Sequence, residues 1–194
     1  MTSFNVVNGV PATGNKWLLT DLLRDQWKFK GFMVSDANSL AEMSEHGMGG
    51  AQRITELAMN AGLDMDMSSS LYVLCLKKAV EEKRVPLSRI DAACRRVLEA
   101  KYKLGLFEDP FRYLKNKQRQ SQVLSPQNRD VARRLAAESN VLLKNSEQLL
   151  PITPPRKIAD VGPMGNVRDE LLGAWPYGYS KDKMHSAYEA LREA

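Results

Sequence analysis

A short apolar segment, bounded by a glycine and an acid, constrains this chain most. Phe32 to Val34 follow Gly31 and stop abruptly at Ser35 and Asp36. An apolar run without polar alternation, bounded by a breaker, is typical of a buried strand. Helical patterns lie on both sides of it, which predicts an α-β-α arrangement and a parallel sheet. In such folds chemistry gathers at the carboxyl ends of strands, so Asp36 is the first candidate catalytic residue.

Apolar residues at helical spacing predict four helices around this strand, at about residues 15–26, 51–61, 71–82 and 88–104. Asn15 is the expected N-cap of the first. Ser88 and Asp91 resemble a capping box at the start of the last, and Gly105 is its expected stop. Residues 1–7 and 63–67 read as further strands, and the polar, glycine-bearing stretch 37–50 reads as a long loop. The pattern is therefore three consecutive βα units.

The composition changes after Phe107, where residues 108–122 become polar and read as an interdomain linker. Ser125 and Pro126 then open a predicted helix that runs to about Ser139. Residues 141–143 and 157–162 read as new strands, followed by a helical pattern at 167–172. Asp160 lies within the second of these strands, where a buried carboxylate would be costly.

Several motifs resemble glycoside hydrolase family 3, and most closely its bacterial periplasmic β-glucosidases. The segment from Gly31 to Asp36 is similar to the strand that ends in that family's catalytic aspartate. Other similar stretches follow in the family's order, at residues 4–5, 8–13, 17–24, 62–65, 93–107 and 140–145. The resemblance implies the C-terminal part of a (β/α)8 TIM-like barrel at residues 1–107, a linker at 108–126 and the beginning of an α/β sandwich domain at 127–194.

The resemblance also implies a retaining, exo-acting β-glycosidase that hydrolyses β-linked oligosaccharides or β-glucosides through a glycosyl-aspartate intermediate on Asp36. The acid/base glutamate of such enzymes comes from the second domain, beyond the point that matches Ala194. Met1 and Phe4 match residues that line the subsite for the non-reducing sugar, with a phenylalanine in place of the family's tyrosine. No cofactor or metal is implied. The resemblance also implies a periplasmic or secreted location for the parent protein. This chain shows no signal peptide, so any export signal is expected upstream of Met1.

Each candidate has a structural alternative. Asp36 alone would more often cap the loop or helix after a strand. A solvent-facing loop explains Glu42, Glu45 and His46 better than catalysis does. Structural roles are also expected for the remaining candidates. Asp64 and Asp66 are expected in polar layers of the barrel, and Trp17, Trp27 and Trp175 as packing residues. Cys75 and Cys94 are expected as buried free thiols.

Composition excludes several classes of function. The chain is 43% hydrophobic and 26% charged, with a net charge of +5 that is scattered along it. No basic stripe with interleaved aromatic residues suggests nucleic-acid binding. No apolar stretch is long enough to cross a membrane.

Two further hypotheses stay open beside the β-glucosidase. Three βα units leave open barrel edges, so the chain is expected to be inactive alone. The missing strands also favour the first hypothesis, a non-catalytic truncated fragment or a carbohydrate-binding or interaction module. A phosphate-binding barrel would need a glycine-rich loop after a late strand, and the serines at 68–70 are a poor substitute. Within the family, β-xylosidase or another specificity is an alternative to β-glucosidase. The sequence leaves oligomeric state open.

Overall fold

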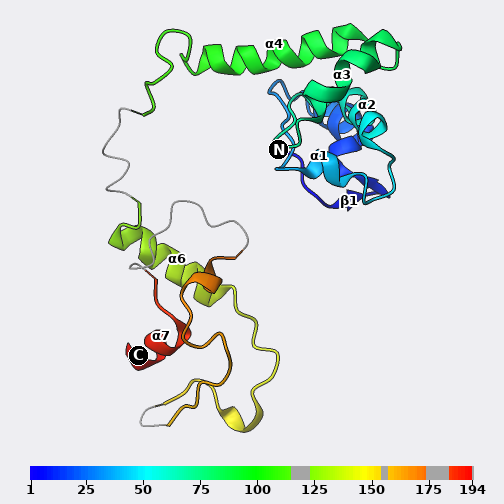
Figure 1. Ribbon diagram of the computed structural model, residues 1–194. Coiled ribbons are helices and arrows are strands. Elements are labelled where there is room, and N and C mark those ends of the chain that lie inside the picture. Colours follow the sequence, from blue (N-terminus) through cyan, green and yellow to red (C-terminus); the bar gives the residue numbers. More distant parts are fainter. Residues whose placement is uncertain (115–122, 154–156, 174–183, 194) are drawn as a thin grey trace. The chain divides into compact units, whose positions relative to one another are not determined.

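The computed structural model describes residues 1–114, 123–153, 157–173 and 184–193 (Figure 1). The chain divides into two compact units, Met1–Val123 and Leu124–Ala194. Residues 115–122 of the predicted linker and Trp175 lie outside the described residues.

The first unit opens with a small hairpin in place of the strand predicted over residues 1–7. Strands β1 (Val6–Val7) and β2 (Val10–Pro11) pair antiparallel. The turn between them is Asn8 and Gly9, with φ of +52° and +78°. An Asn-Gly pair suits such a turn, because both residues tolerate the left-handed backbone that joins twisted strands. The predicted turn is confirmed, and the predicted strand is wrong except at its end.

Three extended segments lie side by side in this unit. Val34 forms a parallel bridge with Met65, and Ser35 N donates to Met65 O at 2.9 Å. Thr2 N donates to Val34 O at 2.8 Å from the other side. The strands predicted at 32–36 and 63–67 therefore pair in parallel. Their ladder is shortened to an isolated bridge, since a parallel sheet gains stability from several neighbouring strands.

The predicted helices of this unit are present. They are η2 (Trp17–Gln26), wound as a π-helix, α2 (Ala51–Ala61), α3 (Leu71–Glu81) and α4 (Leu87–Lys103), the long green helix of Figure 1. Asn15 caps the first, because its Oδ1 accepts from Leu18 N at 3.0 Å. Gly105 ends α4 with φ +68°. The predicted capping box at Ser88 is wrong: extended Pro86 precedes α4, and no side chain caps its start.

The stretch 37–50 is more than a polar loop. It contains the short helix α1 (Ser39–Glu42), and the single-turn helix η1 (Ala12–Gly14) packs against α1 and α2. Leu40 and Met43 are both fully buried. Leu40 and Met43 lie in a mostly polar run that is too short to show a helical stripe, so the sequence pattern hides their role. They anchor the segment that follows Asp36 to the core.

The core of the first unit consists of two adjoining apolar clusters. One lies between η2, α1, α2 and the paired segments, and comprises Leu19, Met33, Leu40, Met43, Ile54, Ala58, Ala61 and Leu63. The other joins α2, α3 and the start of α4, and comprises Met59, Leu76, Ala79, Val85 and Ala93. Tyr72 packs against both clusters. Burial of these side chains is the main favourable term in the folding of this unit.

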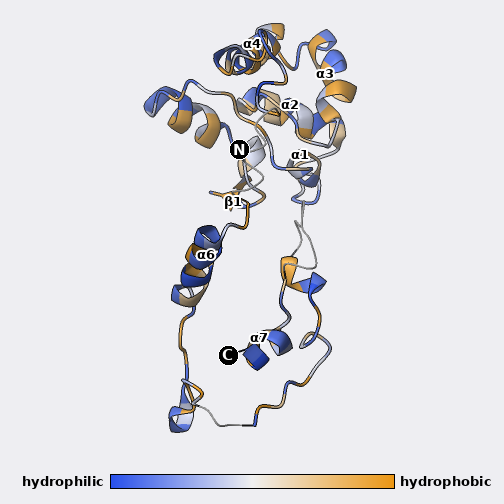
Figure 2. Ribbon diagram, turned by 90° about the vertical axis from the view of Figure 1, so that its left-hand side faces the viewer, coloured by the Kyte–Doolittle hydropathy of each residue, from blue (hydrophilic) through white to orange (hydrophobic). Residues whose placement is uncertain are grey.

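The second unit contains α6 (Pro126–Glu138), the short helices η3 (Ser146–Gln148) and η4 (Asp169–Leu172), and α7 (Ala187–Glu193). Ser125 caps α6 by accepting from Asn128 N at 3.2 Å, which confirms the predicted start. Figure 2 shows hydrophobic and hydrophilic residues together along α6, and none of its residues is buried. The predicted strands at 141–143 and 157–162 do not form, since neither finds a partner strand among the described residues.

Four side chains differ in exposure from expectation. Trp17 is 45% exposed and Trp27 68% exposed, because the inner face of η2 is formed by its leucines. Cys75 is half-buried and Cys94 is exposed, both as free thiols. Packing roles for the tryptophans and burial for the thiols are therefore wrong. The free state of the thiols is as predicted.

Candidate active site

Asp36 lies at the carboxyl end of the extended segment that pairs with Met65. Its side chain is half-buried. Oδ1 accepts a hydrogen bond from Ala37 N at 2.7 Å, and the main-chain oxygen accepts from Ser39 N at 3.1 Å. No described residue donates to Oδ2. The carboxylate therefore supports the turn into α1 with one oxygen and leaves the other for further partners.

Ser35, next to Asp36, has its side chain on the buried side of the segment. The residue is completely buried, and its Oγ accepts from Met67 N at 2.8 Å. Asn38 N donates to Met67 O at 3.0 Å, just beyond the candidate nucleophile. Since successive side chains of an extended segment point to opposite sides, burial of Ser35 directs Asp36 away from the core.

The structure places the two predicted subsite residues on the segment beside Asp36. The hydrogen bond from Thr2 N to Val34 O holds Met1 next to the paired segments. Met1 is 69% exposed, and Phe4 is half-buried just before β1. A chain of buried hydroxyls fixes this region, because Thr13 Oγ1 lies 2.9 Å from Thr2 Oγ1 and 3.0 Å from Ser39 Oγ.

The charged residues after Asp36 face solvent. Glu42, Glu45 and His46 are all exposed, and His46 Nε2 lies 3.8 Å from Glu42 Oε1 within one helical turn. Such an exposed contact, which is an ion pair only when the imidazole is protonated, contributes little to stability. Their exposure agrees with the solvent-facing loop expected from the sequence.

Asp64 has the structural role expected of it, with partners that the sequence does not reveal. Its side chain is 1% exposed and pairs with Arg24 Nη2 at 2.5 Å and Arg96 Nη1 at 2.6 Å. Its Oδ2 also accepts from Met33 N at 2.7 Å. Burial lowers the pKa of the Arg24 guanidinium, an effect that Asp64 opposes and the Arg96 charge reinforces.

Asp66 stabilises the turn that leads into α3. Its two oxygens both accept from Ser69 Oγ at 2.6 Å, and Oδ2 accepts from Tyr72 N at 3.3 Å. Tyr72 donates its hydroxyl to Leu63 O at 2.9 Å. Burial first, and then the charges of Asp66 and Asp64, raise the pKa of the Tyr72 phenol well above its usual value. The phenol is therefore a neutral donor that ties α3 to the strand segment.

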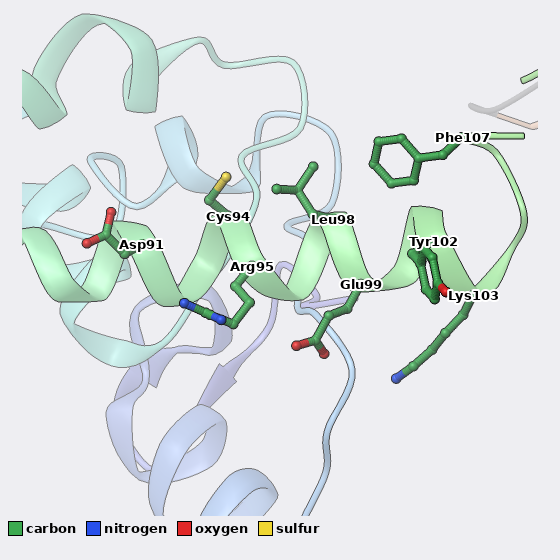
Figure 3. Close-up of a pocket in the computed structure, with 8 residues that line it drawn as sticks. All are labelled: Asp91, Cys94, Arg95, Leu98, Glu99, Tyr102, Lys103 and Phe107. Carbon is green, nitrogen blue, oxygen red and sulfur yellow. The ribbon is translucent and has the colours of Figure 1, made fainter.

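An open groove of about 590 Å³ runs along α4 rather than at Asp36 (Figure 3). Its walls are formed by Asp91, Cys94, Arg95, Leu98, Glu99, Tyr102, Lys103 and Phe107. Figure 3 shows these side chains along one helix and the turn after it. The groove includes Cys94 and Leu98 of the apolar stripe predicted for α4 beside four charged side chains, and Figure 3 shows its two acids, Asp91 and Glu99, pointing to different sides of the helix.

Within the described ranges, no cluster of histidine, cysteine, aspartate and glutamate side chains has a geometry that would hold a metal ion. In the same part of the chain, no helix combines the length and apolarity that a bilayer crossing requires.

Comparisons with known proteins agree with one another. A β-glucosidase from Listeria innocua, whose crystal structures include a complex with glucose, is 40% identical over 100% of this chain and 27% of its own, with a TM-score of 0.75. A periplasmic β-glucosidase from Salmonella typhimurium is 38% identical over 90% of this chain. A β-xylosidase from Formosa agariphila is 34% identical over 89% of this chain.

This chain spans 23% of the length of the Salmonella protein and 25% of the Formosa protein. Residues 1–100 of the 194 match the family described as glycosyl hydrolase family 3 N terminal domain, and they include the whole parallel pair with Asp36 at its end. The chain belongs to glycosyl hydrolase family 3.

Proposed function

We propose that this chain carries the nucleophile of a retaining, exo-acting β-glycosidase of the β-glucosidase type. The observation that carries the proposal is the position of Asp36, half-buried at the end of a segment in parallel pairing, with Oδ2 open to further partners. Relatives named β-glucosidases support this reaction and a β-glucoside or β-linked oligosaccharide as substrate. The name of the Salmonella relative supports a periplasmic location for the parent protein.

In the proposed reaction the ionised Asp36 carboxylate attacks the anomeric carbon of the sugar. The bond to the leaving oxygen breaks as an acid donates a proton to that oxygen, and a glycosyl-aspartate ester forms. Water, deprotonated by the same acid/base, then hydrolyses the ester. Retaining enzymes hold the two carboxyl groups about 5–5.5 Å apart. Glu42 and Glu45, the acids of the loop after Asp36, are exposed, and we propose that the acid/base is a residue outside this chain.

The proposed architecture is the C-terminal part of a (β/α)8 barrel at 1–107, a linker at 108–126 and the start of an α/β sandwich at 127–194. Three extended segments in the first unit are fewer than the eight strands that close such a barrel. The remaining strands would supply the donors that an ionised nucleophile needs, beyond the single amide of Ala37. Met1 and Phe4 would then line the subsite for the non-reducing sugar.

A chimera tests the nucleophile directly. The matched segment of the Listeria innocua β-glucosidase is replaced by this chain, and the product is assayed on an aryl β-glucoside. We expect turnover, its loss in Asp36→Ala, and its retention in the control Glu42→Ala, which alters an exposed carboxylate six residues away. A slow fluorinated glycoside should label the peptide that ends at Asp36. Labelling at any other residue would contradict the proposal.

The 194-residue chain alone is expected to be inactive or nearly so, and turnover equal to that of a full-length relative would overturn this expectation. The Formosa relative favours β-xylosidase specificity as the second candidate. Parallel assays of the chimera on aryl β-glucoside and aryl β-xyloside distinguish the two. A non-catalytic module would bind oligosaccharides and leave the chimera without turnover.

A further inference from the structure

A buried carboxylate ties three separate parts of the first unit together. Asp64, 1% exposed, accepts from Arg24 of η2, from Arg96 of α4 and from the main-chain amide of Met33. The two arginines lie 40 and 32 residues away in the sequence. A buried carboxylate with three charge-assisted or main-chain donors is satisfied, whereas one without them would be strongly destabilising.

Arg24 extends this network to the main chain at the start of both paired segments. Its Nη1 donates to Gly31 O at 3.1 Å and its Nη2 to Gly62 O at 3.4 Å. The start of the segment that leads to Asp36 is therefore held at Gly31 by Arg24 and at Met33 by Asp64. We call Asp64, Arg24 and Arg96, with these main-chain bonds, the carboxylate clamp.

The clamp acts on a segment whose other main-chain hydrogen bonds do not form a regular ladder. Met33 O accepts from Asp64 N at 2.9 Å and Met65 N at 3.0 Å, and Ser35 N donates to Met65 O. Beyond this isolated bridge the segment has no regular ladder. In an extended segment a slip of one residue moves every side chain to the opposite face. Such a slip would put Ser35 where Asp36 now lies.

We propose that the carboxylate clamp sets the register of residues 31–36 and so positions the Asp36 carboxylate, with Asp64 as a positioning residue. The catalytic part of this inference rests on the proposed function, whereas the register part does not. The Asp64 carboxylate contacts the segment at Met33, three residues before Asp36, so we infer that Asp64 acts through Met33 and not on a substrate. A misplacement of about 1 Å at a reacting group can cost on the order of 100-fold in rate.

Hydrogen exchange on the 194-residue chain tests the register part. The amides of Met33 and Ser35 should be protected in the wild type and should exchange at least about tenfold faster in Asp64→Asn. The matched control is Glu56→Gln. Glu56 is a buried acid whose side chain is 4% exposed and pairs with Arg84 Nε at 2.6 Å, away from the segment. Equal protection in both variants, or no protection in the wild type, would overturn the clamp.

Kinetics of the chimera test the catalytic part. The concentration of active sites is measured from the burst of released leaving group, so that loss of folded enzyme does not lower the kcat calculated per site. We expect kcat per titrated site to fall about tenfold to a hundredfold in Asp64→Asn, with KM changed far less, and to stay unchanged in Glu56→Gln. Equal kcat per site in both variants would show that Asp64 is only structural.

Arg96 offers a milder variant in case Asp64→Asn does not fold. Its side chain is 30% exposed, so Arg96→Met removes one arm of the clamp from its outer side. We expect the same direction of change, with Arg95→Met on the outer face of α4 as the unaffected control. The two proposals can fail separately. If the chimera with the unsubstituted chain shows no turnover while protection of the Met33 amide still depends on Asp64, the proposed function is rejected and the clamp stands.

Discussion

Truncation of Leu40 to alanine tests how the segment after Asp36 is held in place. Leu40 lies in α1, is 0% exposed and packs in the cluster with Met33, Met43 and Leu63. Loss of its methylene and methyl groups removes about 2 kcal/mol of transfer free energy at roughly 0.8 kcal/mol per group. The cavity that remains raises the cost to about 3 kcal/mol, within the usual range of about 2–5 kcal/mol for such changes. The unfolding constant should therefore rise roughly 150-fold.

Urea unfolding of the chain, followed by far-UV circular dichroism, measures this cost. The matched control is Leu74→Ala, the same truncation on α3 at a side chain that is 71% exposed. The control should change the free energy of unfolding by less than about 0.5 kcal/mol. Equal costs for the two truncations, or a cost below about 1 kcal/mol for Leu40→Ala, would refute the packing of α1 against the core.

Three further changes test other contacts. Burial raises the pKa of Tyr72 above its usual 10.0, so the unfolded chain ionises first and Tyr72 should make stability fall as pH rises above that value. Tyr72→Phe should make this alkaline decline shallower in urea unfolding, and an unchanged slope would contradict the prediction. The hydrogen bond from Arg168 lowers the pKa of Glu189 to about 2, and Arg168→Gln should return it toward 4.5 in an NMR titration. Gly62→Ala should lower the melting temperature for two reasons. The backbone at φ +106° costs an L-residue about 1–2 kcal/mol of folding free energy, and the added Cβ would lie 2.8 Å from Thr20 Oγ1. An unchanged melting temperature would contradict this.

Helices were predictable wherever a local signal marks them. The stripe of α2, the cap at Asn15, the Ser125-Pro126 start of α6 and the stop at Gly105 all lie within a turn or two of the residues they organise. The start of α7 is a missed signal of the same kind. Ser186 Oγ accepts from Glu189 N at 3.1 Å while Glu189 Oε2 accepts from Ser186 N at 2.8 Å, which is a capping box readable in the sequence.

Strands were less predictable, because their stability depends on partners that local sequence does not supply. The runs at 32–36 and 63–67 find each other and pair over one bridge. The runs at 141–143 and 157–162 read equally well as strands, yet they remain without a ladder. Asp160, the unusual residue of the last run, is exposed, so its carboxylate bears no cost of burial.

The sequence by itself determined the family, the extended run that ends at Asp36, and most helices of the first unit with the cap at Asn15, because these depend on motifs and periodicities formed by residues close together in the chain. Only the tertiary structure decided that Leu40 and Met43 are buried and that Asp64 joins Arg24 to Arg96. Those contacts span tens of residues, and a carboxylate takes whichever buried cations the packed helices bring to it. Periodicity reports which face of a helix is apolar, whereas packing alone selects the partner.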